Sequence, residues 1–70
     1  MKLEFKTIVG QDNKFVWDGY EDGPDTSDRP VLLNIGEEDE YLSDLNFHCK
    51  DLEIDLGELR VVDVTVEVKL

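Results

Sequence analysis

The clearest alternation of apolar and polar positions lies at the C-terminal end of the chain. Valine or leucine occupies every even position from 62 to 70, and the odd positions between them hold Asp63, Thr65, Glu67 and Lys69. A period of two with β-branched residues predicts a strand with one buried face. Leu59 and Val61 extend the apolar run out of register, so we expect a strand that reaches the last residue and has a bulge near residues 60–62.

The N-terminal segment shows a similar alternation and is followed by a turn. Leu3, Phe5, Thr7 and Val9 share one face of a strand. The sequence Gly-Gln-Asp-Asn at residues 10–13 is typical of a hairpin turn. Residues 14–18 then resume the strand pattern, with two aromatic side chains on one face, so residues 1–18 are predicted to form a β-hairpin.

The middle of the chain begins with a segment that cannot form a core. Residues 18–30 hold two glycines, two prolines and five acidic residues, which predicts a loop. Residues 31–35 are a short apolar run that predicts a buried strand, and Gly36 ends it. We therefore expect a long acidic loop that leads into one short strand.

A helix is predicted to begin at the acidic residues 37–40, because carboxylates favour a helix N-terminus. Tyr41, Leu42 and Leu45 would form its apolar side. Residues 46–55 alternate between apolar and polar, with a break in phase near Asp51, and predict a further strand. A glycine at position 57 then marks the turn before the last strand.

These elements predict one β-rich domain over residues 1–70. The expected fold class is mainly β, a small antiparallel sheet of four to five strands with at most one short helix, and α+β is the alternative. A domain of roughly 60 residues buries only about 60% of its unfolded surface, so its core is marginal. Oligomerisation is a common remedy for a small core, and a homodimer and a monomer both stay open.

Net charge narrows the class of partner. Eighteen acidic residues stand against seven basic ones, for a formal net charge of −11, and residues 15–58 alone hold fourteen carboxylates and two cations, which gives −12. High charge with low hydrophobicity is typical of disorder, but 40% of this chain is apolar and patterned. Such a surface repels nucleic acid and anionic membranes and attracts basic proteins.

The composition also indicates the compartment. The chain has one cysteine, Cys49, so an internal disulfide is excluded. Its N-terminal residues have no apolar run of signal-peptide length, and no stretch approaches the roughly 20 apolar residues of a membrane span. We expect a cytoplasmic protein, in the host cytoplasm if a phage encodes it.

Candidate catalytic and metal sites are weak. His48 and Cys49 are adjacent, and on the strand predicted there they would point to opposite faces, which excludes a dyad. A zinc site needs about four ligands, and these two are the only Cys and His residues. The segment that begins at Asp18 resembles a calcium loop, but Tyr20 and Arg29 occupy positions that need oxygen ligands. We expect no cofactor, no metal and no enzyme activity.

Carboxylates on a strand can imitate a row of phosphates. Side chains two residues apart lie roughly 6.6–6.8 Å apart on one face, and DNA carries a phosphate per ~3.4 Å of each strand. Asp51, Glu53 and Asp55 have this spacing on the strand predicted over residues 46–55, and Asp63 and Glu67 partly repeat it on the last strand. The sequence thus predicts an acidic face that suits a DNA-binding protein.

In size, charge, lack of catalytic groups and the acidic 18–58 segment, the chain resembles the small acidic DNA mimics made by bacteriophages. The resemblance implies an inhibitor that occupies the DNA-binding surface of a basic host protein and does not bind nucleic acid or membranes itself. An HU-type nucleoid protein is favoured as target, because a small inhibitor suits a small basic dimer. The implied partner-binding residues are Asp18, Glu21, Asp22, Asp25, Glu37, Glu38, Asp39, Glu40, Asp51, Glu53 and Asp55.

Two other interpretations stay open. An antitoxin or immunity-type binding module would bind through a compact hot spot, with Trp17 and Tyr20 as aromatic anchors. A structural or salt-adapted domain would carry the same charge as a solvated face. Sequence alone does not show whether the carboxylates share one face, because that depends on the order of the strands.

Overall fold

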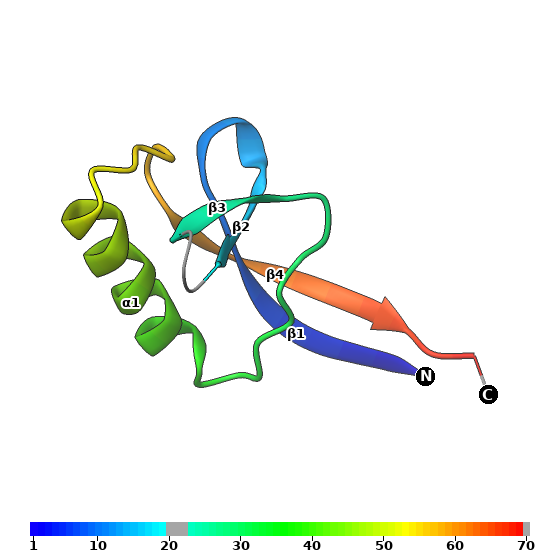
Figure 1. The fold of residues 1–70 in the computed structure, drawn as a ribbon. Helices are drawn as coiled ribbons and strands as arrows, with labels where there is room; N and C mark the ends of the chain where they lie inside the picture. The colour runs from blue at the N-terminus through cyan, green and yellow to red at the C-terminus, as the bar shows by residue number, and fades with distance from the viewer. Residues whose placement is uncertain (20–22, 70) are drawn as a thin grey trace.

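One antiparallel sheet and one α-helix build the described part of the chain (Figure 1). The computed structural model describes residues 1–19 and 23–69. The sheet has the order β3-β2-β1-β4. The predicted class, a small antiparallel sheet of four to five strands with at most one short helix, is confirmed, with four strands and one helix of 14 residues. The elements are β1 (Lys2–Val9), a 3-10 turn η1 (Gln11–Asn13), β2 (Phe15–Asp18), β3 (Pro24–Ser27), α1 (Glu38–Asp51) and β4 (Arg60–Glu67).

The predicted N-terminal hairpin is confirmed. β1 and β2 are antiparallel with Val9 opposite Phe15. Asp12 and Asn13 take positive φ values of 60° and 57° in the turn, and Asp and Asn adopt this left-handed conformation more readily than most residues. The Gly10 N–H donates to the carbonyl of Lys14 at 2.9 Å and closes the turn.

The loop predicted over residues 18–30 is wrong in its second half. Residues 24–27 form β3, which pairs with all four residues of β2. Pro24 lies at the first position of an edge strand, where its missing N–H breaks no ladder bond. The polar composition of this segment led to the prediction of a loop. A short edge strand can form from such a sequence, because its backbone hydrogen bonds need few apolar side chains. Residues 20–22 lie outside the described residues.

β4 confirms the predicted C-terminal strand and corrects two details. It pairs with β1 along its whole length, from Lys2 opposite Glu67 to Val9 opposite Arg60, with no bulge. Val61 packs against the core, whereas Val62 faces the other side of the sheet. The apolar run therefore crosses from one face to the other without a change of register. The strand ends at Glu67, before the last residues.

The strand predicted over residues 31–35 is wrong in extent. Leu33 forms a single isolated bridge with Lys6, with backbone hydrogen bonds of 2.9 and 2.8 Å. Leu33 is buried, but Leu32 and Ile35 are exposed. The chain must turn at Gly36, which has φ of 105°, to begin α1, so the pairing stops after one residue.

The strand predicted over residues 46–55 is wrong, because α1 continues to Asp51. The side chains at 41, 42, 45, 48 and 49 recur at helical spacing and form its inner face. This long-range packing outweighs the local alternation of residues 47–51. Glu53, with φ of 56°, takes the left-handed position that glycine usually fills after a helix, and the Ile54 N–H donates to the carbonyl of Cys49 at 2.9 Å.

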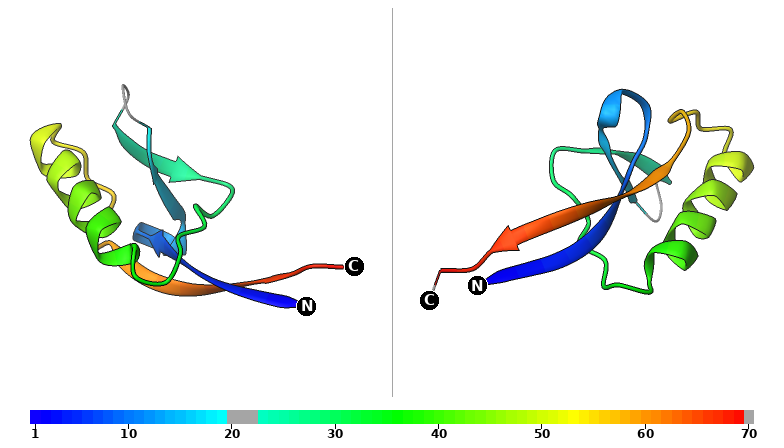
Figure 2. Two further views of the ribbon diagram at one scale, coloured as in Figure 1. Left: turned by 90° about the horizontal axis from the view of Figure 1, so that it is seen from below. Right: turned by 180° about the vertical axis from the view of Figure 1, so that it is seen from behind.

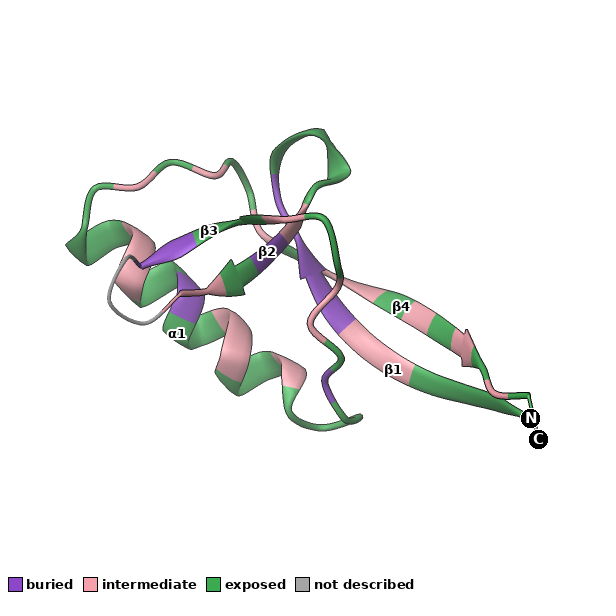
Figure 3. Cartoon of the chain, turned by 45° about the vertical axis from the view of Figure 1, so that its right-hand side comes forward, coloured by how far each residue is buried: buried purple, intermediate pink, exposed green. Residues whose placement is uncertain are grey.

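The core lies between α1 and one face of the sheet. Its fully buried residues are Ile8, Val16, Leu33 and Leu45, and partly buried side chains such as Val61 surround them. Figure 3 shows the buried segments where β1, β2 and α1 meet, and an exposed N-terminal half of β1. That half of β1 and its partner in β4 form a two-stranded ribbon that extends away from the body (Figure 2). The molecule measures 43 × 22 × 21 Å.

Candidate functional site

The outer side of α1 carries a row of carboxylates. Residues 37, 40, 44, 47 and 51 are spaced by three or four, so their side chains share one helix face. All five are exposed, and four of them are acidic. The distance along the helix axis from the first to the last is about 21 Å. We call these four carboxylates the acidic stripe: Glu37, Glu40, Asp44 and Asp51.

The N-terminal end of the stripe is fixed by hydrogen bonds. The Asn34 backbone N–H donates to Glu37 Oε2 at 3.2 Å, and the Gly36 N–H donates to Glu38 Oε2 at 2.6 Å. Backbone N–H groups of Glu38 and Gly36 hold the pKa of the Glu38 carboxyl below its ordinary value. Carboxylates are favourable at a helix N-terminus, where the peptide dipoles leave positive charge. The acidic cluster thus helps the helix to begin.

The stripe is not neutralised by the rest of the described chain. The ion pairs among described residues join Lys6 to Asp63 and His48 to Asp18, and neither includes a stripe residue. Residues 37–51 contain six carboxylates and one lysine, a net charge of −5 with His48 neutral. Exposed charges closer together than the Debye length, about 8 Å at physiological salt, add their fields. The outer side of α1 therefore presents a negative potential that is strongest over Glu37, Glu40 and Asp44, whose rises of about 4.5 and 6 Å are within this length.

Asp18 joins β2 to α1. Its backbone N–H donates to the hydroxyl of Tyr41 at 3.0 Å, and its carboxylate lies 2.9 Å from His48 Nδ1. The side chain of Asp18 is only 19% exposed. Of the predicted partner-binding residues, Asp18 is thus engaged within the protein itself, where it positions α1 against the sheet.

The other predicted residues lie in different places. Glu37 to Glu40 form the first turn of α1 and the residue before it, and Asp25 is exposed on β3. Glu53 is in the left-handed turn after the helix, and Asp55 accepts a hydrogen bond from the Gly57 N–H at 3.0 Å. Glu21 and Asp22 lie outside the described residues. The structure therefore gathers Glu37, Glu40 and Asp51 on one face and separates Asp25 from them.

The predicted phosphate-like row of Asp51, Glu53 and Asp55 is wrong. These residues lie at the helix end, in the turn and in the loop that follows, so they have no common strand spacing. From the sequence, Asp44 was not identified as a candidate binding residue. It was also not predicted that Phe47, which lies beside the stripe, is 66% exposed. The three-and-four spacing from residue 37 to residue 51 was the signal in the sequence that would have found both.

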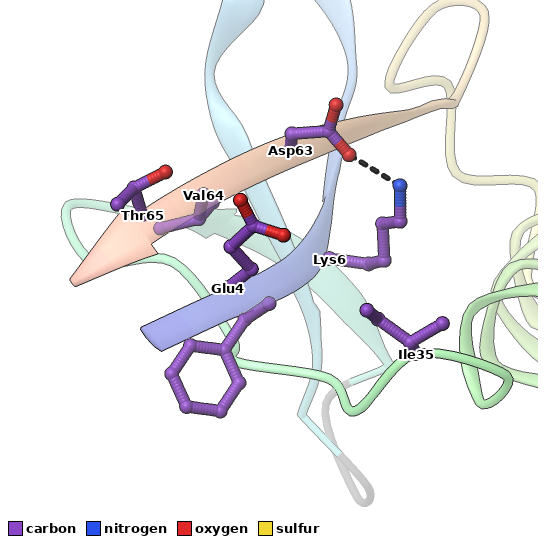
Figure 4. A pocket seen from close by; sticks show the side chains of 7 residues that line it. Glu4, Lys6, Ile35, Asp63, Val64 and Thr65 are labelled. Carbon is purple, nitrogen blue, oxygen red and sulfur yellow. Dashed lines mark hydrogen bonds and ion pairs between the residues drawn. The ribbon is translucent and has the colours of Figure 1, made fainter. Parts of the chain in front are cut away.

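The Cys49 thiol lies in a setting that lowers its reactivity. Burial, with smaller effects of Asp18 and Asp55, raises the pKa of the Cys49 thiol, and the thiolate is the reactive form. Within residues 1–19 and 23–69 no group of three potential metal ligands occurs. A surface depression of about 270 Å³ beside the β1–β4 ribbon includes Glu4, Lys6 and Asp63 in its lining, and its lysine is already paired with Asp63 (Figure 4).

None of the described helices is long and apolar enough to cross a membrane. Comparison with protein-family models, with curated proteins and with solved structures finds no match to this chain. The assignment of a function therefore depends on the geometry and the charge of the surface.

Proposed function

We propose that this protein inhibits a basic DNA-binding protein by occupying its DNA-binding surface with the acidic stripe. The observation that carries the proposal is the exposed row Glu37, Glu40, Asp44 and Asp51, which has no cationic partner among the described residues. A surface selected to hold phosphates has the complementary potential, so encounter is accelerated at low salt.

The stripe has dimensions that suit this role. Its carboxylates follow one another along the helix axis at rises of about 4.5, 6 and 10.5 Å. Together they span about 21 Å, or roughly six base-pair steps of a DNA strand. A helix replaces the strand on which the mimicry was first predicted, and it presents its charges at a comparable density. The favoured target is a small basic HU-type nucleoid protein, as the resemblance to phage inhibitors implies.

A second function is favoured by one observation. Phe47 is 66% exposed and lies against a shallow depression that it shares with Lys50 and Asp51. Aromatic side chains dominate the hot spots of compact protein interfaces. An antitoxin or immunity-type module would therefore bind through Phe47, and carboxylates would contribute little. The two functions predict opposite rankings of the same variants.

The test is displacement of fluorescent duplex DNA from a purified HU-type protein, measured by anisotropy. The stripe variant combines Glu40→Gln, Asp44→Asn and Asp51→Asn, and the matched control combines Glu4→Gln, Asp12→Asn and Glu67→Gln. Both variants change the net charge from −11 to −8, and all six residues are exposed. Only the stripe variant removes charge from α1.

The wild-type protein and the control should displace DNA, and the stripe variant should do so roughly threefold to 150-fold less well. Three exposed ion pairs of about 0.2–1 kcal/mol each give this magnitude. Equal loss in the stripe variant and the control would show that only net charge matters. Loss on Phe47→Ala, with an active stripe variant, would establish the binding module instead. If the protein displaced DNA from none of three targets, an HU-type protein, uracil-DNA glycosylase and a restriction enzyme, the proposal that it is an inhibitor of DNA binding would be refuted.

A further inference from the structure

The sheet has a second face that is largely apolar. Residues directly opposite each other on neighbouring strands point to the same face. Leu3 pairs with Val66, Phe5 with Val64, and Thr7 with Val62, so these six side chains lie on one side of β1 and β4. Ile8, whose side chain is in the core, points the other way, toward α1. The apolar residues at positions 3, 5, 62, 64 and 66 therefore lie on the face opposite the helix.

This outer face continues onto neighbouring segments. Val9 is opposite Phe15, so Phe15 and, two residues later, Trp17 belong to the same side. The Lys6–Leu33 bridge places Leu32 beside Thr7 on this side. We define the outer face as Leu3, Phe5, Thr7, Val9, Phe15, Trp17, Leu32, Val62, Val64 and Val66. Arg60, opposite Val9, adds one exposed cation at the end of this face and donates a hydrogen bond to Asn13 Oδ1.

The outer face is only partly covered by the described residues. Thr7 and Val9 at its centre are buried by their neighbours, but Leu3, Trp17 and Leu32 are 38%, 44% and 45% exposed. Figure 2 shows α1 beside the end of β1 and β4 that belongs to the body. Because Ile8 and Val61 face the core that α1 covers, the outer face lies on the opposite side of these strands. Exposed apolar side chains that lie together often mark a contact with another molecule, and Leu3, Trp17 and Leu32 are such side chains on this face.

The total surface is larger than the mass of the chain predicts. The chain exposes 5400 Å². A compact monomer of 8.1 kDa is expected to expose only about 4500 Å². The excess of about 900 Å² is close to the roughly 800 Å² that each partner buries in a stable interface of standard size. This excess belongs to the whole elongated molecule, both sides of the β1–β4 ribbon included, and a partner on the outer face would cover part of it.

Charge points to a second copy of this chain as the partner. The ribbon residues 2–6 and 62–69 carry three lysines and three carboxylates, so this end is neutral in a molecule of net charge −11. The polar side chains of the ribbon lie on its helix side, where Lys6 pairs with Asp63 beside Glu4 and Thr65 (Figure 4). Two copies that meet through their outer faces keep their acidic stripes apart, because α1 lies on the other side of each sheet.

We propose that the protein forms a symmetric homodimer in which the outer faces of two sheets pack against each other. The same patch serves on both subunits, as two-fold symmetry requires. Packed sheets lie about 10 Å apart, and the two α1 helices lie on the far sides of this pair. The proposal does not depend on the proposed function, although it would give one assembly two acidic stripes.

The test compares two substitutions at consecutive positions of β4. Val64→Lys introduces a charge on the outer face, and Thr65→Lys introduces the same charge on the helix side beside Glu4. Molar mass is measured by analytical ultracentrifugation from about 1 to 500 µM protein, and circular dichroism monitors folding. Wild type and Thr65→Lys should sediment as dimers, and Val64→Lys should sediment as a monomer. A monomeric wild type at every concentration, or a dimeric Val64→Lys, would overturn the proposal.

A second measurement needs no variant. Trp17 is the single tryptophan of the chain and lies on the outer face. Its fluorescence should shift to longer wavelength on dilution, at the concentration where the mass falls by half, because dissociation exposes the indole to water. A dimer that dissociates with unchanged Trp17 emission would show that the copies meet elsewhere, for example along the free edge of β4, and would refute the outer-face interface.

Discussion

Alanine substitutions at Leu45 and Phe47, compared with each other, test whether residues 46–51 belong to the helix. Leu45 is fully buried against Ile8, Val16 and Leu33. Truncation of a buried leucine to alanine costs about 2–5 kcal/mol, as lost burial plus the cavity left behind. Domains of this size have a total stability of roughly 3.5–10 kcal/mol. Leu45→Ala should therefore remove a large share of the free energy of unfolding.

Phe47→Ala is the matched comparison, two residues further along. The Phe47 residue is 66% exposed, so about a third of a burial energy of 1.5–3 kcal/mol is lost. Alanine restores up to about 0.7 kcal/mol through its higher helix propensity. We expect a net change below about 0.5 kcal/mol. On a strand over residues 46–55, Phe47 would instead share a face with Cys49 and contribute to the core.

The assay is urea unfolding followed by circular dichroism at fixed protein concentration. With an m-value of about 1–1.5 kcal/mol/M, a loss of 3 kcal/mol moves the midpoint for Leu45→Ala down by about 2–3 M. Phe47→Ala should move it by less than about 0.5 M. Ile8→Val, with an expected cost of about 0.5–1.5 kcal/mol, gives a readable value if Leu45→Ala does not fold. Comparable losses at positions 45 and 47 would refute the helix register.

Three further substitutions have expected outcomes. Glu53→Gly should raise stability by up to about 1 kcal/mol, because Glu53 has φ of 56° and glycine takes this conformation without steric cost. Glu58→Gly is the control, and the urea midpoints of the two variants show whether only the change at position 53 stabilises the protein. Thr7→Val should raise stability by about 1 kcal/mol, since Thr7 is fully buried and its hydroxyl has no described hydrogen-bond partner; Thr65→Val, at an exposed site, should change little. Glu38→Gln should remove an acid-sensitive part of the stability: the pKa of Glu38 lies below its ordinary 4.5 in the fold, so its contribution is present above pH 4.5 and is lost as pH falls through the folded value. Unfolding of both proteins between pH 7 and pH 3 in 0.5 M salt measures this, and a constant difference between them would contradict the assigned hydrogen bonds.

The sequence predicts an element well where one local pattern dominates. β1 and β4 alternate over most of their length, with interruptions at Ile8 and Val61, and the Gly10–Asn13 turn contains residue types that accept positive φ. These segments need little information from the rest of the chain. Their pairing also explains why Val61 and Val62 are both apolar, since one faces the core and the other faces the outer side of the sheet.

The errors arise where tertiary contacts decide between two patterns. Phe47, Cys49 and Asp51 alternate as in a strand, but Leu45, His48 and Cys49 follow the helical spacing that begins at Tyr41, and contact with the core selects the helix. The end of α1 carries no glycine to mark it, because a glutamate takes the left-handed position. The local sequence past residue 45 fits both a helical spacing and a strand alternation, and alternation alone does not decide between them.

The sequence predicted an acidic binding surface, but it did not predict which residues form it. Clustered charge is visible in composition, whereas the stripe depends on which residues the helix turns outward. Asp18 looks like any other acidic residue in the sequence, and only the fold brings His48 within 2.9 Å of it. The apolar outer face could not be separated from the core by alternation alone, because both faces of β4 carry valine.

The central claim is that the acidic stripe binds the DNA-binding protein, and mapping the contact by nuclear magnetic resonance tests it most directly. The isotope-labelled protein is titrated with unlabelled HU-type protein, and duplex DNA is then added. The account predicts that amide signals of residues 37–51 shift, that those of residues 2–6 and 62–67 do not, and that DNA reverses the shifts. Shifts confined to the outer face, or shifts in 37–51 that persist in excess DNA, would contradict it.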